Sequence, residues 1–194
     1  MLFTSINGIS WQPVSLIYEG DRCDETAIEF LPDGTMISTQ RLEYSDSWLG
    51  DSRACTGIRI AKPPYTQWTG IKDYSTRLDG PALFVYNGKV YAIGRRNPYT
   101  PGLLNKYGSI LAKKRTSLWL VTPEKLVWLS DVPSAGDTSY AGYVIRSNTL
   151  YFSYYTSSIY HDYPWIVGMI KESPIMMGKL NLNLLEQLAQ SKIK

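Results

Sequence analysis

The sequence predicts an all-β fold of the β-propeller type, with about three four-stranded blades in a partial ring and a short C-terminal helix. Three segments read as strand, tight turn and strand, and their turn residues Gly34, Gly88 and Asn148 recur at intervals of 54 and 60 residues. Such a period is typical of four-stranded propeller blades. The 194 residues are 44% hydrophobic, and turn-forming residues are spread along the whole chain. These features favour a single domain over residues 1–194.

The expected elements follow from short β-branched or aromatic runs bounded by Pro, Gly, Asn or Ser. Residues 1–20 are expected to form the remnant of a blade, followed by blade units at about 24–72, 79–130 and 138–182. The outer strands expected for these units are 56–62, 117–121, 126–129, 166–170 and 174–180. The tail at about 182–193 is expected to form an amphipathic helix, because Leu184, Leu185 and Leu188 lie near one face.

Polar side chains stand at matching places in the three hairpins. Seven residues after the turn residues stand Arg41, Arg95 and Tyr155. Eight or nine residues before the turn residues stand Glu25, Gly80 and Tyr140. Both ends of a hairpin lie together, opposite its turn. If the hairpins are equivalent units, a carboxylate, two guanidinium groups and a phenol project from one common rim.

Two further motifs carry a resemblance to a known family. Residues 5–11, Ser-Ile-Asn-Gly-Ile-Ser-Trp, look like an Asp-box turn with Asn7 in the Asp position, in which the polar side chain ties the backbone and Trp11 packs between blades. Residues 25–41 resemble the Glu-x-x-x-x-Glu-x-x-Asp-Gly-x-x-x-x-x-x-Arg stretch of the sialidase superfamily, and residues 136–142 resemble its Tyr-Ser-Asp segment. The chain therefore looks like the C-terminal half of a six-bladed sialidase propeller.

This resemblance implies specific catalytic roles. Tyr140 would be the nucleophile, Glu25 its carboxylate partner, and Arg41 and Arg95 two of three arginines that bind the substrate. Sialic acids carry a carboxylate on the anomeric carbon, which guanidinium groups hold by bidentate hydrogen bonds. The implied reaction is the retaining hydrolysis of a terminal sialic acid or a related acidic sugar, in which the carboxylate takes the phenol proton as the tyrosine attacks.

The sequence also departs from the family pattern. Asp24 replaces an asparagine, and Ala141 and Gly142 replace the serine and aspartate that follow the tyrosine. No counterpart of the family's first arginine or of its acid/base aspartate precedes Glu25, so missing N-terminal blades or another chain are expected to supply them. A half ring leaves apolar edges open to water, and self-association is expected.

Several other residues are candidates for binding a glycan. Asp137 is expected either to cap its turn or to line the pocket. Tyr65, Trp68 and Tyr99 lie in long loops rich in Pro and Gly, where they would either stack on sugar rings or pack between blades.

Two other functions remain open. The chain could be a non-catalytic glycan-binding propeller, in which the arginines recognise a carboxylate without turnover. It could also hydrolyse a neutral glycan with Glu25 and Asp137 as an ordinary carboxylate pair, as in arabinan-cleaving propellers. Such pairs lie about 5 to 5.5 Å apart for retention and about 6.5 to 9.5 Å apart for inversion.

Composition argues against several other classes of protein. A net charge of +3 is small and dispersed, which argues against nucleic acid, and the basic run 113–115 is expected to be a solvated loop. No apolar stretch approaches the roughly 20 residues that cross a bilayer, and the N-terminus lacks the features of a signal peptide. His161 is the sole histidine, so no metal site and no cofactor are expected.

Overall fold

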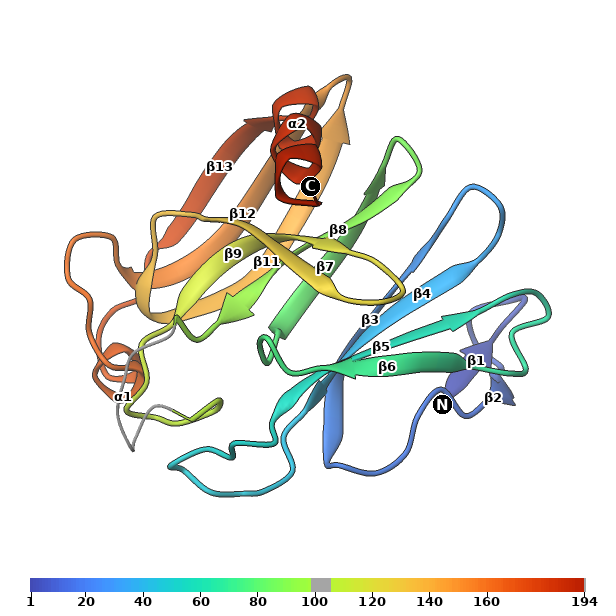
Figure 1. Cartoon of the computed structure of the whole chain (residues 1–194), viewed down its shortest axis with the longest axis horizontal. Helices are drawn as coiled ribbons and strands as arrows, with labels where there is room; N and C mark the ends of the chain where they lie inside the picture. The colour runs from blue at the N-terminus through green and yellow to red at the C-terminus, as the bar shows by residue number, and fades with distance from the viewer. Residues whose placement is uncertain (99–105, 194) are drawn as a thin grey trace.

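The computed structural model describes residues 1–98 and 106–193. Strands account for 51% of the residues and helices for 9%, and the strands form four antiparallel sheets that fan out side by side (Figure 1). The first sheet is the short hairpin of β1 (Leu2–Thr4) and β2 (Gln12–Ser15).

The three larger sheets follow one another along the chain. The second sheet contains β3 (Cys23–Phe30), β4 (Met36–Leu42), β5 (Cys55–Ala61) and β6 (Thr69–Asp73). The third contains β7 (Asp79–Tyr86), β8 (Lys89–Arg96), β9 (Arg115–Val121) and β10 (Leu126–Asp131). The fourth contains β11 (Ala135–Arg146), β12 (Thr149–Ser158) and β13 (Ile175–Asn181), and the helices are α1 (Trp165–Met169) and α2 (Leu182–Ile193).

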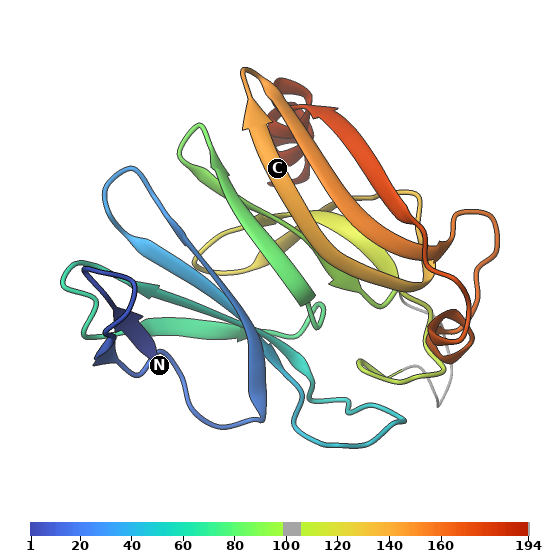
Figure 2. The ribbon, with the colours of Figure 1, turned by 180° about the vertical axis from the view of Figure 1, so that it is seen from behind.

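The first strand of each large sheet lies beside the first strand of the next. Strand β7 contacts both β3 and β11, and the three hairpin turns point to the same side of the molecule (Figures 1 and 2). The β7–β8 turn has two residues, Asn87 and Gly88, with φ of 48° and 70°. Positive φ at both positions is the geometry that matches the twist of a tight hairpin.

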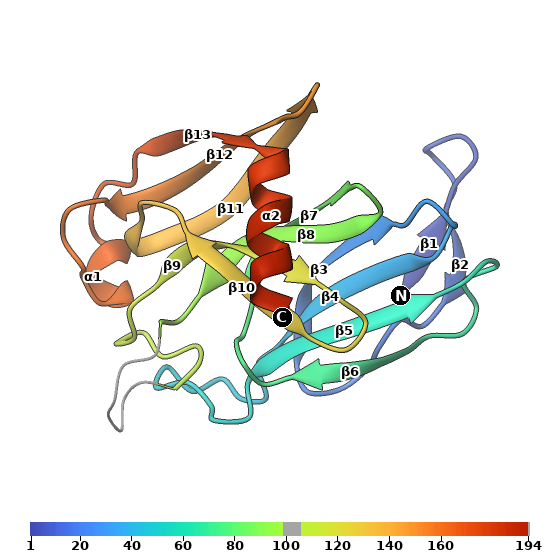
Figure 3. The same cartoon turned by 45° about the horizontal axis from the view of Figure 1, so that its top comes forward.

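Two apolar clusters hold neighbouring sheets together. One joins the second and third sheets, with Ile37 and Ile58 packed among residues of β7 to β10. The other joins the third and fourth sheets and includes Phe84, Tyr91 and Phe152. Helix α2 contributes three buried residues to the latter cluster, Leu182, Leu185 and Ala189, and lies against β10 and β13 (Figure 3).

Some local predictions are wrong, and packing explains why. Residues 166–170 were expected to be a strand, but 165–169 form α1. The Gly168 amide donates to the Pro164 carbonyl at 3.2 Å, which closes a helical turn, and Gly168 lies so close to β11 that an added Cβ would stand 2.0 Å from the amide nitrogen of Asp137. Conversely, β6 lies within a segment that reads as a loop. In α2, Leu184 is 60% exposed, because the helix turns Leu182 and Leu185 toward the sheets instead.

Two further expectations fail at single side chains. Trp11 was expected to pack between blades, but it is 58% exposed. The side-chain Oδ1 of Asn7 nevertheless accepts hydrogen bonds from the amides of Ile9 and Ser10, both at 2.9 Å. Lys114, within the run expected to be solvated, is fully buried, and its amine donates to the Asn97 side chain at 2.7 Å.

Candidate active site

Irregularities in three neighbouring strands produce the polar cluster at the rim opposite the hairpin turns. The antiparallel register shifts between residues 23 and 26 of β3, between 79 and 82 of β7, and between 139 and 142 of β11. Glu25, Gly80 and Tyr140 lie within these bulges. Gly80 and Tyr140 have left-handed φ values of 55° and 49°. Bulges commonly change the direction of side chains at functional sites. Here the three bulges lie on neighbouring inner strands, at the same rim.

Tyr140 and Glu25 meet directly. The Tyr140 hydroxyl donates a 2.7 Å hydrogen bond to Oε1 of Glu25, although 115 residues separate the two in sequence. The other carboxylate oxygen accepts a 2.7 Å hydrogen bond from the Gly80 amide. Nη1 of Arg41 lies 3.1 Å from Oε1 of Glu25. A phenol, a carboxylate and a guanidinium group thus share one contact.

Arg95 lies beside Asp137 on the same rim. Its Nη1 is 3.2 Å from Oδ1 of Asp137, which also accepts hydrogen bonds from the hydroxyl of Tyr155 at 3.1 Å and from the indole of Trp165 at 2.7 Å. The ring of Tyr155 stacks on that of Tyr140 with centroids 6.2 Å apart. This stacking connects the Arg95–Asp137 pair to the Tyr140–Glu25 pair.

The buried carboxylate of Asp79 forms ion pairs with Arg77 and Arg95. Asp79 is fully buried and accepts hydrogen bonds from Arg77 at 2.6 and 2.7 Å and from Arg95 at 3.3 Å. Arg77 also donates to Glu43 at 3.1 Å, and Glu43 in turn lies 3.5 Å from Arg41. The three arginines are therefore held in one continuous network of ion pairs.

The pKa values reflect this network. The hydrogen bond to Glu25, burial and the Glu25 charge raise the pKa of Tyr140 above its usual value, and Arg95 and Arg41 oppose the shift. Burial of Asp79 would raise the pKa of its carboxyl, but the charges of Arg77 and Arg95 outweigh burial and hold that pKa well below its usual range. Tyr140 is therefore a protonated donor at neutral pH, and Asp79 is ionised.

The cluster carries an excess of negative groups. Five carboxyl groups contact the three guanidinium groups of Arg41, Arg77 and Arg95, and they belong to Asp24, Glu25, Glu43, Asp79 and Asp137. Burial lowers the pKa of the Lys114 amine well below its usual value, and this amine donates to the Asn97 side chain. An anionic ligand must therefore displace or outcompete carboxylates that already occupy the arginines.

Two predicted binding residues lie elsewhere. The Tyr65 hydroxyl donates to the carbonyl of Gly34 at 2.9 Å, and the Trp68 indole donates to Ser15 at 2.8 Å. Gly34 is in the turn of the β3–β4 hairpin, at the opposite end from Glu25 and Arg41. The prediction that Tyr65 and Trp68 line the same pocket is contradicted, because the Tyr65 side chain ties the β5–β6 connection to the β3–β4 turn and the Trp68 side chain ties it to the N-terminal hairpin. Tyr99 lies outside the described residues.

Sequence reasoning missed several members of the network, although the repeat held a signal for one of them. Asp24 precedes Glu25, and Asp79 precedes Gly80 at the equivalent position. Each pairs with the arginine near the end of the next strand, as Asp24 does with Arg41 and Asp79 with Arg95. Arg77 and Trp165 have no comparable signal, because they come from connections that differ between units.

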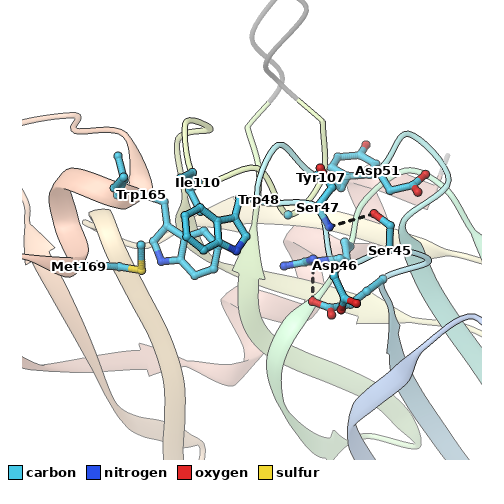
Figure 4. Close-up of a pocket in the computed structure, with 14 residues that line it drawn as sticks. Ser45, Asp46, Ser47, Trp48, Asp51, Tyr107, Ile110, Trp165 and Met169 are labelled. Atoms are coloured by element: carbon cyan, nitrogen blue, oxygen red, sulfur yellow. Dashed lines mark hydrogen bonds and ion pairs between the residues drawn. The ribbon is translucent and has the colours of Figure 1, made fainter.

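A cavity of about 410 Å³ opens beside the cluster (Figure 4). It lies between the β4–β5 connection, residues 107–110 and α1. Glu43, Arg77 and Trp165 belong both to its walls and to the ion-pair network, whereas Glu25 and Tyr140 do not line it. The cavity is thus a neighbour of the Tyr140–Glu25 pair.

The described residues, 1–98 and 106–193, contain neither a metal-binding cluster nor a membrane-spanning helix. Within these ranges, no group of three or more His, Cys, Asp or Glu side chains is placed to hold a metal ion. No helix in the same ranges is long and apolar enough to cross a membrane.

Comparisons with known proteins reveal similarity of fold. No protein-family model matches the chain, and no curated protein sequence matches it. Similar solved structures include an α-L-arabinofuranosidase from Fusarium graminearum in complex with an iminosugar inhibitor, with a TM-score of 0.58 and 14% identity over 84% of this chain and 46% of that chain. The GH93 α-L-arabinofuranosidase of the same organism in complex with arabinobiose gives a TM-score of 0.57 and 14% identity over 85% and 47%.

The compared structures are propeller glycoside hydrolases, and this chain spans less than half of their length. The predicted fold class, an all-β propeller segment with a short C-terminal helix, is confirmed. The more specific resemblance to the sialidase superfamily is not confirmed by these comparisons.

Proposed function

We propose that the chain carries the nucleophile of a retaining glycoside hydrolase, in which Tyr140 attacks the anomeric carbon and Glu25 takes its proton. The 2.7 Å hydrogen bond between these side chains carries the proposal. A phenol with a raised pKa is a weak nucleophile, so a base in direct contact is needed for attack at neutral pH. Similarity of fold to glycoside hydrolases adds support.

The proposed reaction follows from the positions of the donors. As the Tyr140 oxygen bonds to the anomeric carbon, its proton passes to Oε1 of Glu25, and the leaving group departs with the glycosidic electron pair. The leaving group takes a proton from solvent. Water then attacks the anomeric carbon and releases its proton to solvent, while Glu25 returns its proton to the departing Tyr140 oxygen, which regenerates the phenol and the carboxylate and retains the configuration. The amide of Gly80 and Nη1 of Arg41 hold the Glu25 carboxylate in line with the phenol.

A terminal sialic acid or a related acidic sugar is the first candidate substrate. The charges of Arg41 and Arg95 both act on the Tyr140 phenol, and guanidinium groups are suited to a substrate carboxylate. The substrate would have to take over hydrogen bonds that Asp24 and Asp137 now make to these arginines.

A neutral glycan cleaved by Glu25 and Asp137 is the second candidate. The excess of carboxylates around the arginines favours it, because an uncharged sugar meets no repulsion there. Asp137 would act as the second carboxyl group, held by Tyr155 and Trp165.

Trapping with activated sugars tests both candidates. A fluorosugar with a fluoride leaving group needs no general acid, so the chain itself should form a stable adduct that mass spectrometry assigns to a residue. We expect labelling of Tyr140 by 3-fluorosialyl fluoride, its loss in Tyr140→Phe, and a decrease of about 10²- to 10⁴-fold in rate in Glu25→Gln. Tyr143→Phe, on the same strand, is the matched control and should label normally.

The outcomes separate the candidates. An adduct on Glu25 or Asp137 with a neutral 2-fluoroarabinosyl fluoride would replace the tyrosine mechanism by the carboxylate pair. No adduct with either reagent, in a folded protein, would reject hydrolysis by this chain and leave the non-catalytic glycan-binding function.

A further inference from the structure

The cavity beside the cluster has fixed walls. The Ile110 amide donates to the Trp48 carbonyl at 2.9 Å, and the Ile166 amide donates to the Ile110 carbonyl at 2.8 Å. These bonds join the β4–β5 connection, residues 107–110 and α1. Gly50, with φ of 76°, lies so near residue 107 that a Cβ would stand 2.4 Å from its carbonyl oxygen. The pocket is thus built into the backbone before any ligand binds.

Its two sides differ in chemistry. The indoles of Trp48 and Trp165 lie on one side with Ile110 and Met169, and Ser45 and Asp46 lie on the other (Figure 4). Trp48 is 77% exposed, so a large aromatic surface at the mouth remains open to water. A pocket with an aromatic wall and a few convergent polar groups is the usual form of a site for a small organic ligand.

The charged side chains that line the pocket already form ion pairs. Arg77, the only guanidinium group among the described residues that line the pocket, donates to Asp79 and Glu43. Asp46 pairs with Arg22, and Asp51 pairs with Arg53 at 2.8 Å. The lining therefore offers carboxylate and hydroxyl acceptors but no unpaired cation among these residues. Sugar hydroxyls donate well to such acceptors, whereas an anionic group would be repelled.

The pocket is continuous with the proposed reaction site on two sides. Glu43 contacts Arg41 at 3.5 Å, and Arg41 contacts Glu25. Trp165 donates to Asp137 and lies beneath Arg95, with the guanidinium carbon 4.8 Å from the ring centroid. A ligand in the pocket would therefore stand next to a sugar bound at Tyr140 and Glu25.

We infer that this pocket is a second sugar subsite, which holds an uncharged sugar unit linked to the one that reacts, with its apolar face on Trp48 and its hydroxyls toward Ser45 and Asp46. The inference rests on the proposed glycosidase function for the link between the two sugars. It does not depend on which nucleophile acts, because binding of the neutral unit uses different side chains.

Direct binding tests the subsite separately from catalysis. Titration calorimetry would use a panel of neutral disaccharides that includes arabinobiose and lactose, with sialic acid as the anionic monosaccharide. At least one neutral disaccharide should bind to the wild-type chain. Its affinity should fall about tenfold or more in Trp48→Ala, because that change removes the stacking surface, and recover in part in Trp48→Phe.

Two controls make the result specific. Trp11→Ala removes another exposed indole, which lies outside the pocket lining, and should leave the affinity unchanged. Tyr140→Phe should abolish trapping and still bind the disaccharide. If no neutral disaccharide binds at millimolar concentration, or if Trp48→Ala binds as well as wild type while its circular dichroism is unchanged, the subsite is refuted. Failure of trapping with retained Trp48-dependent binding would reject the reaction and keep the subsite.

Discussion

Gly80 controls the geometry of the Tyr140–Glu25 pair because it has no side chain. Its φ of 55° is left-handed, and an added Cβ would stand 2.5 Å from Oγ of Ser139 and 3.1 Å from the Tyr140 ring. Its amide also holds Oε2 of Glu25. The position therefore demands glycine for both the backbone and the site.

We expect Gly80→Ala to slow trapping of the tyrosine at least tenfold, because the methyl group displaces the phenol from its carboxylate. Gly88→Ala is the matched control, since Gly88 has φ of 70° but no atom within 4 Å of an added Cβ. Both changes should cost about 1 to 2 kcal/mol in unfolding free energy from backbone strain. Equal trapping rates in the two variants would contradict a positioning role for Gly80.

Asp79 links the stability of the molecule to pH. The folded-state pKa of its carboxyl lies well below the unfolded value of about 3.9, so its stabilisation is fully present above that value and is lost as the pH falls toward the folded pKa. We expect the wild-type unfolding free energy, measured with urea, to decline steeply between about pH 5 and pH 2.

The Asp79→Asn variant should be about 3 to 5 kcal/mol less stable at pH 7, because two buried arginines lose their partner, and should decline less on acidification. Glu172→Gln, at an exposed position, should follow the wild-type curve. A wild-type stability that stays constant from pH 7 to pH 3 would argue against this role of Asp79.

At the level of elements, α2 acts as a cover for one end of the core. Leu185 is 2% exposed among residues of the third and fourth sheets, whereas its neighbour Leu184 is 60% exposed. Both are leucines in the same helix, so their helix propensities are equal. Only their burial differs.

Leu185→Ala should therefore lower the unfolding free energy by about 2 to 5 kcal/mol, through lost burial and a cavity. Leu184→Ala should change it by less than about 0.5 kcal/mol. Urea denaturation monitored by tryptophan fluorescence measures both. Similar losses in the two variants would show that the helix does not dock on the sheets as described.

At the level of the whole molecule, the fourth sheet ends in an exposed strand. Within the described residues, β13 pairs with β12 alone, and its outward side chains Ile175 and Met177 are 78% and 79% exposed. On the inner strand β11, Val144 is 59% exposed. Open strand edges with apolar side chains promote association between chains.

We expect the purified chain to self-associate with rising concentration, which light scattering coupled to size exclusion would detect. Met177→Lys should weaken this association, because a charge on an edge strand opposes pairing. Leu184→Lys changes an equally apolar, exposed residue on α2 and should have little effect. If the chain stays monomeric at all concentrations, the β13 edge does not mediate association.

Much of the site could be predicted because, in a hairpin, the number of residues from the turn determines how far a side chain lies from it. Residues a fixed distance from each turn reach the same rim, so the sequence alone places Glu25, Arg41 and Tyr140 together. Predictions for loop residues had no such rule. Tyr65 and Trp68 accordingly lie at the opposite end of their sheet, where they bind Gly34 and Ser15.

By itself the sequence determined the strand periodicity, the turns and the set of polar residues near the rim, because these depend on local spacing and backbone preference. Only the tertiary structure decided which groups touch. The bulges that aim Glu25 and Tyr140 at each other, the burial of Asp79 and Lys114, and the cavity beneath Trp48 all depend on how separate sheets pack. Such contacts join residues far apart in sequence, and local sequence patterns do not specify how one sheet is placed against the next.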